Sequence, residues 1–558
     1  MRILALFIFL SFLHIDPAQQ DTLIYWITFS DKDNSSFDVN DPSAFLSERC
    51  IERREKFNIP ILEEDLPVNQ NYIDNVVSSG NIWLHNKSKW FNSIAVYCDD
   101  TLAYQNLLTL PFVVSGERVK SPISKKNEKF EVLDKVFVDD YSVNHHFPFG
   151  KSFEQLKLHN ANRLHELGFK GQGKLIAVID AGFLNVNVME GLEHLYDNNQ
   201  LLSFKDFVAH DNSVYEDHVH GAAVLSIMAG DIEGIYQGTA PGANYLLLRT
   251  EDAGSEAPVE EFNWISAAEY ADSAGADILN TSLGYTTFDD STFNHSYSDL
   301  DGKTTLIAQA CNLAHAKGML VCNSAGNSGS NDWGYISTPA DADSAFTIGA
   351  VDSTGRYAPF SSYGPSADGD LKPNSVSVGW NTYFISPYDN RIVQANGTSF
   401  SSPMMAGMAA CLWQALPDYS NGQIKRLIES VGSRHDVPDT FFGHGYPDMW
   451  LAYTKETGVN YQPADELFVK DLYPNPIEKN QQFNVEVVSK ETGSISIEIV
   501  DITGKKLQSS TLPITQGRNL ITLQTQDHPS GIYQIIFDDG ENRILKRLII
   551  RSKGTTER

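Results

Sequence analysis

Four residues of the kinds that cooperate in hydrolysis lie in separate parts of this 558-residue chain. Asp180 ends the run LIAVID, His220 stands in EDHVHGAAVLSIMAG, Asn327 ends MLVCNSAGN and Ser399 lies in ANGTSFSSP. A serine hydroxyl becomes a nucleophile when a histidine takes its proton and a carboxylate orients that histidine. An asparagine amide can bind the oxyanion that then develops. This set of residues is suited to acyl transfer from a carbonyl substrate.

Each of these residues also has a structural interpretation when it is taken alone. Asp180 at a strand end is a candidate cap, Asn327 after a glycine is a candidate turn residue, and His220 can be a surface histidine. His218 and His220 form an H-x-H pair, which supplies half of a zinc site. The sequence contains no H-E-x-x-H or C-x-x-C to add further ligands, so we expect no metal at this pair.

Local patterns place these residues at the ends of helices. Pro403 is best tolerated in the first turn of a helix, so the helix is expected to start close to Ser399. Ser401 and Ser402 would then be first-turn residues, and all three serines are candidate caps. The apolar positions after His220 have helical spacing, which puts His220 at a helix start. The N–H of Ser399 would point at incoming negative charge, together with the helix dipole.

The order of the elements predicts the fold that holds these residues. Between residues 151 and 460, apolar strands such as KLIAVID and ADILNTSLG alternate with helical segments such as TTLIAQACNLAHAKG. This α/β alternation predicts a parallel sheet with helices on both faces. Ligands bind such sheets at the carboxyl ends of the strands, which is where Asp180 and Asn327 are expected.

The regions on either side have different patterns. Residues 20–120 show the order β-α-β-β-α-β of a small ferredoxin-like α+β unit. Its first helix is expected over DPSAFLSERCIERREKF, with Asp41 as its cap and Pro42 at its first position. The stretch KSPISKKNEKFEVLDK, residues 120–135, is polar and lysine-rich and predicts a linker over residues 121–150. Residues 466–558 alternate in short strands and predict an all-β sandwich.

Composition restricts the class of protein further. Residues 1–19 place Arg2 before a short apolar run, the layout of a secretory signal peptide, and no later run is long enough to cross a membrane. The formal net charge of −29 argues against a nucleic-acid partner and for a solvated extracellular surface. Five cysteines are too few for a disulfide framework, although Cys50 and Cys98 could pair with each other.

Four segments together resemble a known family. VIDAGF, HGAAVLSIMAG, NSAGN and NGTSFSSP are similar, in this order, to the Asp, His, oxyanion-Asn and Ser motifs of the subtilases, the subtilisin-like serine proteases. The chain order Asp, His, Ser is that of subtilisin, and the G-x-S-x-G elbow of α/β-hydrolases is absent. The resemblance implies a serine endopeptidase domain in which Asp180, His220 and Ser399 form the triad and Asn327 completes the oxyanion hole.

The resemblance also implies where a peptide substrate would bind. The segment ILNTSLG resembles the strand that pairs with the substrate chain. The implied substrate-binding residues are Ser282, Leu283, Gly284, Ser324, Ala325 and Gly326. The back of the first specificity pocket is expected around SGSNDWGYIS, which carries Asp332 and Trp333. The implied chemistry needs no cofactor and no metal ion; structural calcium is common in the family, but the sequence has no EF-type loop.

Several positions depart from the family pattern. Ala181 follows Asp180 where a serine or threonine is usual, which removes a hydroxyl able to bond the carboxylate. The familiar H-G-T-H run is HGAA here, and KPNSVSVG stands where K-P-D-x-x-A-P-G is frequent. These changes leave the triad intact and are expected to affect rate and specificity.

The terminal regions extend the resemblance. Residues 20–120 resemble an inhibitory subtilase propeptide, which implies a zymogen that is cut within 121–150. LYPNP, DITGKKL and SGIYQIIF resemble the sorting domain of the type IX secretion system, so residues 466–558 are expected to bring the protein to the cell surface or the medium. The implied partners are protein or peptide substrates, the chain's own propeptide and the secretion machinery. The alternative is an inactive, protease-like surface adhesin, which the intact set of four residues disfavours.

Overall fold

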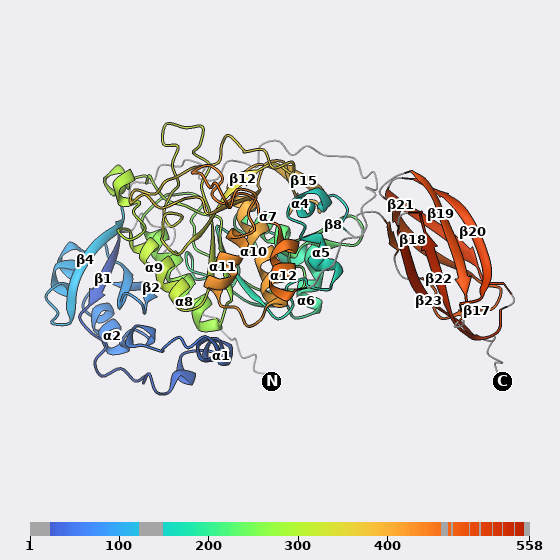
Figure 1. The fold of residues 1–558 in the computed structure, drawn as a ribbon. Coiled ribbons are helices and arrows are strands. Elements are labelled where there is room, and N and C mark those ends of the chain that lie inside the picture. Colours follow the sequence, from blue (N-terminus) through green and yellow to red (C-terminus); the bar gives the residue numbers. More distant parts are fainter. Residues whose placement is uncertain are drawn as a thin grey trace, which may run out of the picture. The chain divides into compact units, whose positions relative to one another are not determined.

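The computed structural model describes residues 23–121, 149–458 and 467–551, without 470–471, 490–491, 502–503, 516, 527 and 541. The expected signal peptide, 1–19, and nearly all of the expected linker, 121–150, lie outside the described residues. The chain divides into two compact units: one contains the N-terminal region and a large parallel sheet, and the other contains the C-terminal strands (Figure 1). Among the described residues, none of the helices has both the length and the apolar character that crossing a bilayer requires.

Residues 23–121 form an α+β region around a four-stranded antiparallel sheet of order β2-β3-β1-β4. Its elements are β1 (Ile24–Phe29), α1 (Glu48–Lys56), α2 (Gln70–Ser78), β2 (Trp83–Ser88), β3 (Ser93–Tyr97), α3 (Thr101–Leu107) and β4 (Val113–Lys120). One face of this sheet packs against α2 and α3 through Ile27, Ile94 and Val96. The other face, with Trp26 and Tyr97, packs against the helices of the large sheet.

The first helix of this region is shorter than the sequence predicts. Pro42–Ala44 form a separate 3₁₀ turn, and Asp41 gives it no side-chain cap because its Oδ1 accepts from the hydroxyl of Ser43 at 2.8 Å. Helix α1 begins only at Glu48, where the hydroxyl oxygen of Ser47 accepts from Cys50 N at 3.1 Å. The prediction of one continuous helix from Asp41 is therefore wrong, because a second capping residue interrupts it.

The large sheet has seven strands in the order β13-β12-β11-β10-β5-β9-β6, all paired in parallel. They are β5 (Leu175–Asp180), β6 (Leu201–Asp206), β9 (Asn244–Arg249), β10 (Ile278–Thr281), β11 (Leu320–Ser324), β12 (Phe346–Val351) and β13 (Ser375–Val378). All six residues of β5 are buried, as a central strand covered on both faces requires. The predicted α/β fold with a parallel sheet is confirmed.

Two pairs of long helices cover the two faces of this sheet (Figure 1). Helices α8 (Val259–Ala274) and α9 (Leu306–Ala316) share a core with alternate residues of β5, Ala177 and Ile179 among them. Helices α7 (His220–Ala229) and α10 (Thr398–Ala415) pack against each other, and α10 runs along β10 to β13. Helices α8 and α9 therefore lie between the large sheet and the N-terminal sheet, and Trp26 stacks on Phe262 with ring centroids 4.1 Å apart.

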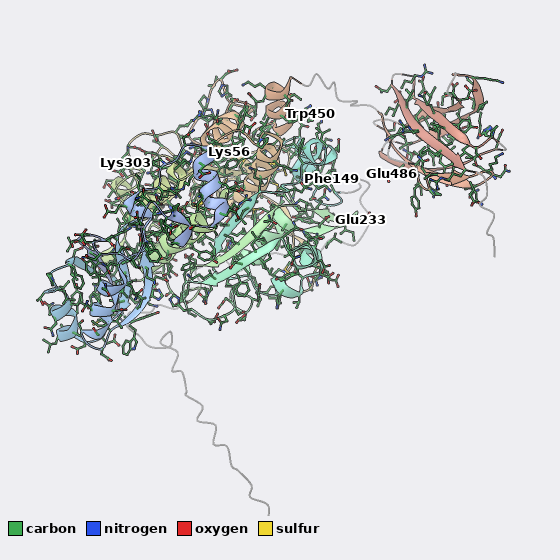
Figure 2. The ribbon with its side chains drawn as sticks, turned by 90° about the horizontal axis from the view of Figure 1, so that it is seen from below. Lys56, Phe149, Glu233, Lys303, Trp450 and Glu486 are labelled. Atoms are coloured by element: carbon green, nitrogen blue, oxygen red, sulfur yellow. The ribbon has the colours of Figure 1, made fainter. Side chains whose placement is uncertain are left out.

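Shorter elements complete this unit. They are α4 (Phe153–Lys157), α5 (Asn162–Glu166), α6 (Glu193–Asp197), β7 (Asp231–Ile232), β8 (Tyr236–Gln237), β14 (Thr382–Ile385), β15 (Ile392–Ala395), α11 (Asn421–Glu429) and α12 (Met449–Thr457). Lys56 of α1, labelled in Figure 2, donates to Pro417 O at 2.7 Å, in the segment between α10 and α11.

The C-terminal unit consists of two sheets, β16-β18-β21 and β17-β23-β22-β19-β20. The strands are β16 (Leu467–Val469), β17 (Ile477–Glu478), β18 (Gln482–Ser489), β19 (Gly493–Val500), β20 (Lys506–Ile514), β21 (Gly517–Gln524), β22 (Gly531–Asp538) and β23 (Arg543–Arg551). Phe483, Ile497, Ile535 and Leu548 belong to one buried core that both sheets share. The predicted all-β region is confirmed.

The five cysteines are all buried free thiols. Cys50 and Cys98 belong to different parts of the N-terminal region, α1 and the end of β3, and each has its own polar neighbours. Cys50 Sγ lies 3.9 Å from Asp272 Oδ1, and Cys98 Sγ lies 3.3 Å from Asp100 O. The pairing left open by the sequence is not formed.

Candidate active site

The register of the central strands brings three predicted residues to one edge of the large sheet. Ile179 of β5 lies beside Thr281 of β10, and Thr281 lies beside Asn323 of β11. The next residue of each segment therefore lies at the carboxyl edge of the sheet, where parallel sheets bind ligands. Those residues are Asp180, Ser282 and Ser324.

Asp180 and His220 form a buried pair. Asp180 is fully buried, and its Oδ1 lies 2.7 Å from His220 Nδ1 and accepts from Ala181 N at 2.8 Å. A carboxylate can only accept, so Nδ1 of His220 carries the proton in this pair. The other ring nitrogen, Nε2, then has the lone pair that a general base needs.

A glycine allows helix α7 to begin this close to strand β5. A Cβ added at Gly221 would lie 2.3 Å from Gly182 O and 2.9 Å from Asp180 Cβ. Both separations are too short for any side chain, so the position after His220 must be glycine for the pair to form.

Asp180 has one oxygen without a partner. Its Oδ2 is buried and makes no hydrogen bond among the described residues. The residue that follows, Ala181, is itself fully buried and has no hydroxyl to offer. The departure noted in the sequence therefore leaves an unsatisfied acceptor beside His220, which costs free energy.

The loop before α7 is held by charge pairs. Arg249, at the end of β9, contacts Asp206 Oδ2 at 2.9 Å through Nη1 and Asp217 Oδ1 at 3.2 Å through Nη2. Burial raises the pKa of Asp217 to about 6, although Arg249 opposes this shift. His218 accepts from His220 N at 3.2 Å through Nδ1, and burial, followed by the charge of His220, lowers the pKa of His218. The H-x-H pair thus orders the helix start through a hydrogen bond.

Ser399 exchanges hydrogen bonds with Ser282. Helix α10 begins at Thr398, so Pro403 is its sixth residue and lies in the second turn, one turn later than predicted. Without an N–H, Pro403 cannot donate to Ser399 O, as residue i+4 of a helix normally does. The hydroxyl of Ser282 donates to Ser399 O at 2.9 Å instead, and the hydroxyl of Ser399 donates to Ser282 O at 3.3 Å.

The three serines at this helix start differ in exposure. Ser399 is partly exposed, whereas Ser401 and Ser402 are fully buried. Ser401 donates to Thr398 O at 2.9 Å, and Ser402 donates to Asn280 Oδ1 at 3.0 Å. Of the three hydroxyls, only that of Ser399 can reach a ligand.

Asn327 is oriented by Thr398. The Asn327 Oδ1 accepts from Thr398 N at 2.9 Å and from its hydroxyl at 3.0 Å, and Thr398 Oγ1 also accepts from Gly326 N at 3.1 Å. A backbone N–H can only donate, so the amide oxygen faces Thr398 and the amide NH₂ is the end left for a ligand. This nitrogen lies 3.6 Å from the position of a Cβ on Gly397, beside the start of α10.

Ser337 lies between the two segments predicted to bind substrate. A Cβ added at Gly284 would lie 2.0 Å from Ser337 Oγ, and one added at Gly326 would lie 3.5 Å from it. Neither composition nor a motif distinguishes this serine in the sequence, because only the fold brings it between the segments that follow β10 and β11.

Asp332 and Trp333, the two residues of SGSNDWGYIS considered for the specificity pocket, do not take the place of Ser337 beside Gly284. Asp332 is exposed, and the indole N–H of Trp333 donates to Ile336 O at 3.2 Å. Ser337, rather than Asp332, therefore contributes the polar group of this segment nearest to Gly284.

Three exposed carboxylates, those of Asp343, Asp368 and Asp370, are the group within the described residues that has the spacing of metal ligands. Lys303 Nζ lies 3.4 Å from Asp343 Oδ2 and 3.3 Å from Asp368 Oδ2. The ammonium already neutralises part of this charge, and exposed acidic groups of this kind are common at protein surfaces.

Three family models match separate parts of the chain. The Subtilase family matches residues 171–445, the Peptidase S8 propeptide domain of Bacteroidota matches residues 24–132, and the Secretion system C-terminal sorting domain matches residues 471–551. The three matches follow one another in the order predicted from the sequence.

Curated relatives are proteases. The chain is 26% identical over 339 residues to a thermostable alkaline protease of Halalkalibacterium halodurans, which covers 60% of this chain and 81% of the relative. It is 30% identical over 284 residues to a thermophilic serine proteinase of Bacillus sp. strain AK1, covering 50% and 62%. It is 27% identical over 290 residues to subtilisin DY of Bacillus licheniformis, covering 51% and 93%.

Proposed function

Residues 171–445 form a peptidase domain of the subtilase family of serine proteases, and from this we propose that the chain cleaves polypeptides through Ser399, His220 and Asp180. The observation that carries the proposal is the pair between His220 Nδ1 and Asp180 Oδ1, at 2.7 Å, on the same sheet edge as Ser282, the partner of Ser399. Asp180 holds the imidazole in the tautomer whose Nε2 can accept a proton.

In the first step the hydroxyl of Ser399 turns from Ser282 O toward His220. Ser399 Oγ attacks the carbonyl carbon of the substrate, and His220 Nε2 takes the hydroxyl proton. The negative charge that develops on the carbonyl oxygen is bound by the NH₂ of Asn327 and the N–H of Ser399, at the positive end of helix α10.

In the second step the tetrahedral intermediate collapses. The C–N bond breaks, and the leaving amine takes the proton from His220, which leaves an ester on Ser399 Oγ. A water molecule then attacks the ester and gives its proton to His220. The carboxylic acid is released and the hydroxyl of Ser399 is restored.

The substrate chain would lie along the two segments at the carboxyl ends of the buried strands β10 and β11. Ser282, Leu283 and Gly284 follow β10, and the segment 324–326 begins at the last residue of β11, at the same sheet edge. Backbone pairing along these segments would hold the peptide in extended form. Ser337, which lies between them, would meet the side chain next to the cleaved bond and favour small or polar groups there.

The chain is exported by the type IX secretion system to the cell surface or the extracellular space, because residues 471–551 are a secretion sorting domain. We infer that residues 24–132, a propeptide domain of this peptidase family, inhibit the peptidase until export is complete. The proposed steps use only side chains and a backbone N–H of the protein and need no cofactor. A structural calcium ion is a separate expectation, which metal analysis of the purified protein tests.

Labelling with a fluorophosphonate and digestion of casein test the proposal. The matured wild-type protein is expected to react with the probe and to cut casein, and Ser399→Ala is expected to do neither. The matched control is Ser401→Ala, which removes a neighbouring hydroxyl that points into the core and should retain both activities. Asn327→Leu should lower kcat about 10²- to 10³-fold, a magnitude established on subtilisin itself. Absent labelling of the wild type, or equal labelling of Ser399→Ala, would instead indicate an inactive binding protein.

A further inference from the structure

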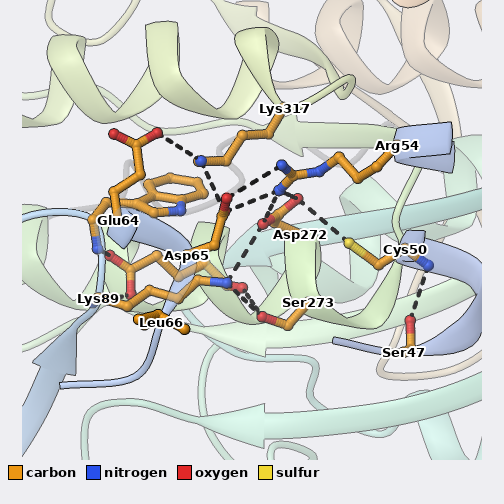
Figure 3. A network of polar contacts seen from close by, with 12 residues as sticks. Ser47, Cys50, Arg54, Glu64, Asp65, Leu66, Lys89, Asp272, Ser273 and Lys317 are labelled. Carbon is orange, nitrogen blue, oxygen red and sulfur yellow. Dashed lines mark hydrogen bonds and ion pairs between the residues drawn. The ribbon is translucent and has the colours of Figure 1, made fainter. Parts of the chain in front are cut away.

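A buried carboxylate on helix α8 has all its cationic partners in the propeptide (Figure 3). Asp272 is fully buried, and Arg53 Nη2 lies 2.6 Å from its Oδ1. Arg54 Nη2 donates to both of its oxygens, at 3.0 and 2.9 Å, and Lys89 Nζ lies 3.5 Å from Oδ2. Among the described residues no cation of the peptidase domain pairs with Asp272.

A second carboxylate extends these contacts into a chain of charges that crosses the interface repeatedly. Asp65 of the propeptide is fully buried. Its Oδ1 accepts hydrogen bonds from Arg54 Nη2 at 3.1 Å and from Lys317 Nζ of the peptidase domain at 2.8 Å. Lys317 also donates to Glu64 at 2.7 Å. The cations lower the pKa of Asp65 and Asp272 despite the burial of both groups, so both are ionised at neutral pH.

The same end of α8 offers further acceptors to the propeptide. Glu269 accepts from the hydroxyl of Ser88 at 2.5 Å, from Lys89 N at 2.7 Å and from Trp90 N at 3.0 Å. Arg49 donates to Gly275 O at 2.9 Å and pairs with Asp277, just beyond the helix. The last carbonyls of a helix carry partial negative charge, so this end of α8 favours cations in any case.

This contact surface is separate from the candidate active site. Helix α8 ends one short loop before β10, whose four residues run from the amino edge of the sheet to the carboxyl edge that holds Ser282. A strand of that length spans about 13 Å. The acidic end of α8 therefore lies at the opposite edge of the sheet from Ser399.

The chemistry of this surface selects arginine. A guanidinium presents several N–H donors in one plane, and Arg54 uses them to contact Asp272 and Asp65 at once. A lysine ammonium is a more strongly hydrated point charge and lacks this planar set of donors. When the propeptide leaves, Asp272 and Glu269 lose their donors together.

We propose that the C-terminal end of α8, with Asp272 and Glu269, and Lys317 at the end of the neighbouring helix α9, form an exosite for paired arginines. The mature peptidase binds its own propeptide there, and Arg54 is the residue on which this binding most depends. The inference rests on the proposed role of residues 24–132 as an inhibitor, but it concerns binding and not hydrolysis. It assigns a large part of the propeptide's affinity to a place that substrates in the cleft do not occupy.

The test uses the full chain with Ser399→Ala, so that no self-cleavage occurs. The recognition sequence of a site-specific protease is inserted within 122–148 and cut with that protease. The rate at which the N-terminal fragment then leaves is measured by size-exclusion chromatography at set times after dilution. The variants are Arg54→Met, which keeps an apolar stem, Asp272→Asn, and both together. The matched control is Lys56→Met, which removes a more exposed cation of the same helix α1 that pairs with Asp418 at 3.2 Å.

Breaking one partner of a buried ion pair is expected to speed departure about 10²-fold or more, whereas Lys56→Met should change the rate less than threefold. The double variant should leave faster than Arg54→Met alone, because Asp272 also contacts Arg53 and Lys89, but by less than the product of the two single effects, because the two residues share one contact. Cooperative thermal unfolding of the uncut chains shows which variants fold. If Arg54→Met does not fold, the release rate of the fragment from Asp272→Asn tests the proposal. Departure at the wild-type rate in the folded variants would overturn the proposal, whatever the protein does to fluorophosphonate.

Discussion

At the scale of single residues, the most unusual feature of the candidate site is that only one of the two oxygens of Asp180 is hydrogen-bonded among the described residues. Oδ1 accepts hydrogen bonds from His220 Nδ1 and from Ala181 N, whereas the buried Oδ2 accepts no hydrogen bond among the described residues. A buried acceptor without a donor costs about 1–3 kcal/mol, which is a large share of the stability of a typical domain. The fold therefore loses some stability at Asp180, the residue that orients His220.

Ala181→Ser should repair this defect. A hydroxyl at position 181 can donate to the carboxylate of Asp180, so we expect the free energy of unfolding to rise by about 1 kcal/mol. Chemical denaturation of the full chain in the Ser399→Ala background measures the change. Ala181→Cys is the control, because it adds a side chain of similar size with a much weaker donor. Equal effects of the two substitutions would show that the unpaired oxygen is not the cause.

At the scale of elements, helix α10 combines a reactive start with a rigid support. Pro403 leaves the carbonyl of Ser399 without its helical donor, and Ser282 of the neighbouring segment fills that position at 2.9 Å. The helix start is therefore tied to the end of β10. Ser402 makes a second tie to the same strand through Asn280.

The two buried serines of α10 should affect stability and not chemistry. Ser402→Ala leaves Asn280 Oδ1 without the donor at 3.0 Å and should cost about 1–3 kcal/mol of unfolding free energy. Ser401→Ala should cost less, because the carbonyl of Thr398 also accepts within the helix. The thermal midpoints of the Ser399→Ala background give the order. A larger loss for Ser401→Ala, or loss of casein cleavage by either variant alone, contradicts this view of the helix.

At the scale of the whole peptidase unit, the propeptide sheet lies over α8 and buries His85 beside His210, which is itself exposed. His85 Nε2 lies 2.9 Å from Asn263 Oδ1 of α8, and its Nδ1 lies 3.1 Å from His210 Nε2. The ring of Tyr97 packs beside it, and Lys120 adds positive charge nearby. Burial, with a smaller contribution from His210, lowers the pKa of His85 from 6.5 to about 3.

Propeptide binding should therefore weaken in mild acid. The bound form holds His85 neutral, so affinity is highest above the free pKa near 6.5 and falls as pH drops from there toward 3. Between pH 7.5 and 5 we expect the cut fragment to leave about tenfold faster or more. Burial raises the pKa of Glu269, which acts in the opposite direction, and the lowered pKa values of Asp65 and Asp272 act only in stronger acid.

The same size-exclusion assay across this pH range measures the effect. His85→Asn keeps a polar side chain that does not titrate and should flatten the pH profile. A profile that is equally steep in His85→Asn would assign the pH dependence to another group.

The sequence by itself determined the α/β fold and the positions of Asp180, His220, Asn327 and Ser399 at the ends of their elements. It could do so because hydrophobic period, glycine and proline act over a few residues, and the fold then gathers strand ends at one edge. The turn in which Pro403 lies could not be predicted. A proline is tolerated there because Ser282, 117 residues from Ser399, donates to the carbonyl of Ser399 that Pro403 leaves without a donor. Only the tertiary structure placed Ser337 between the segments that follow β10 and β11, and Arg54 on Asp272, 218 residues away. Such contacts form when distant parts of the chain pack together, so the spacing of residues along the sequence does not predict them.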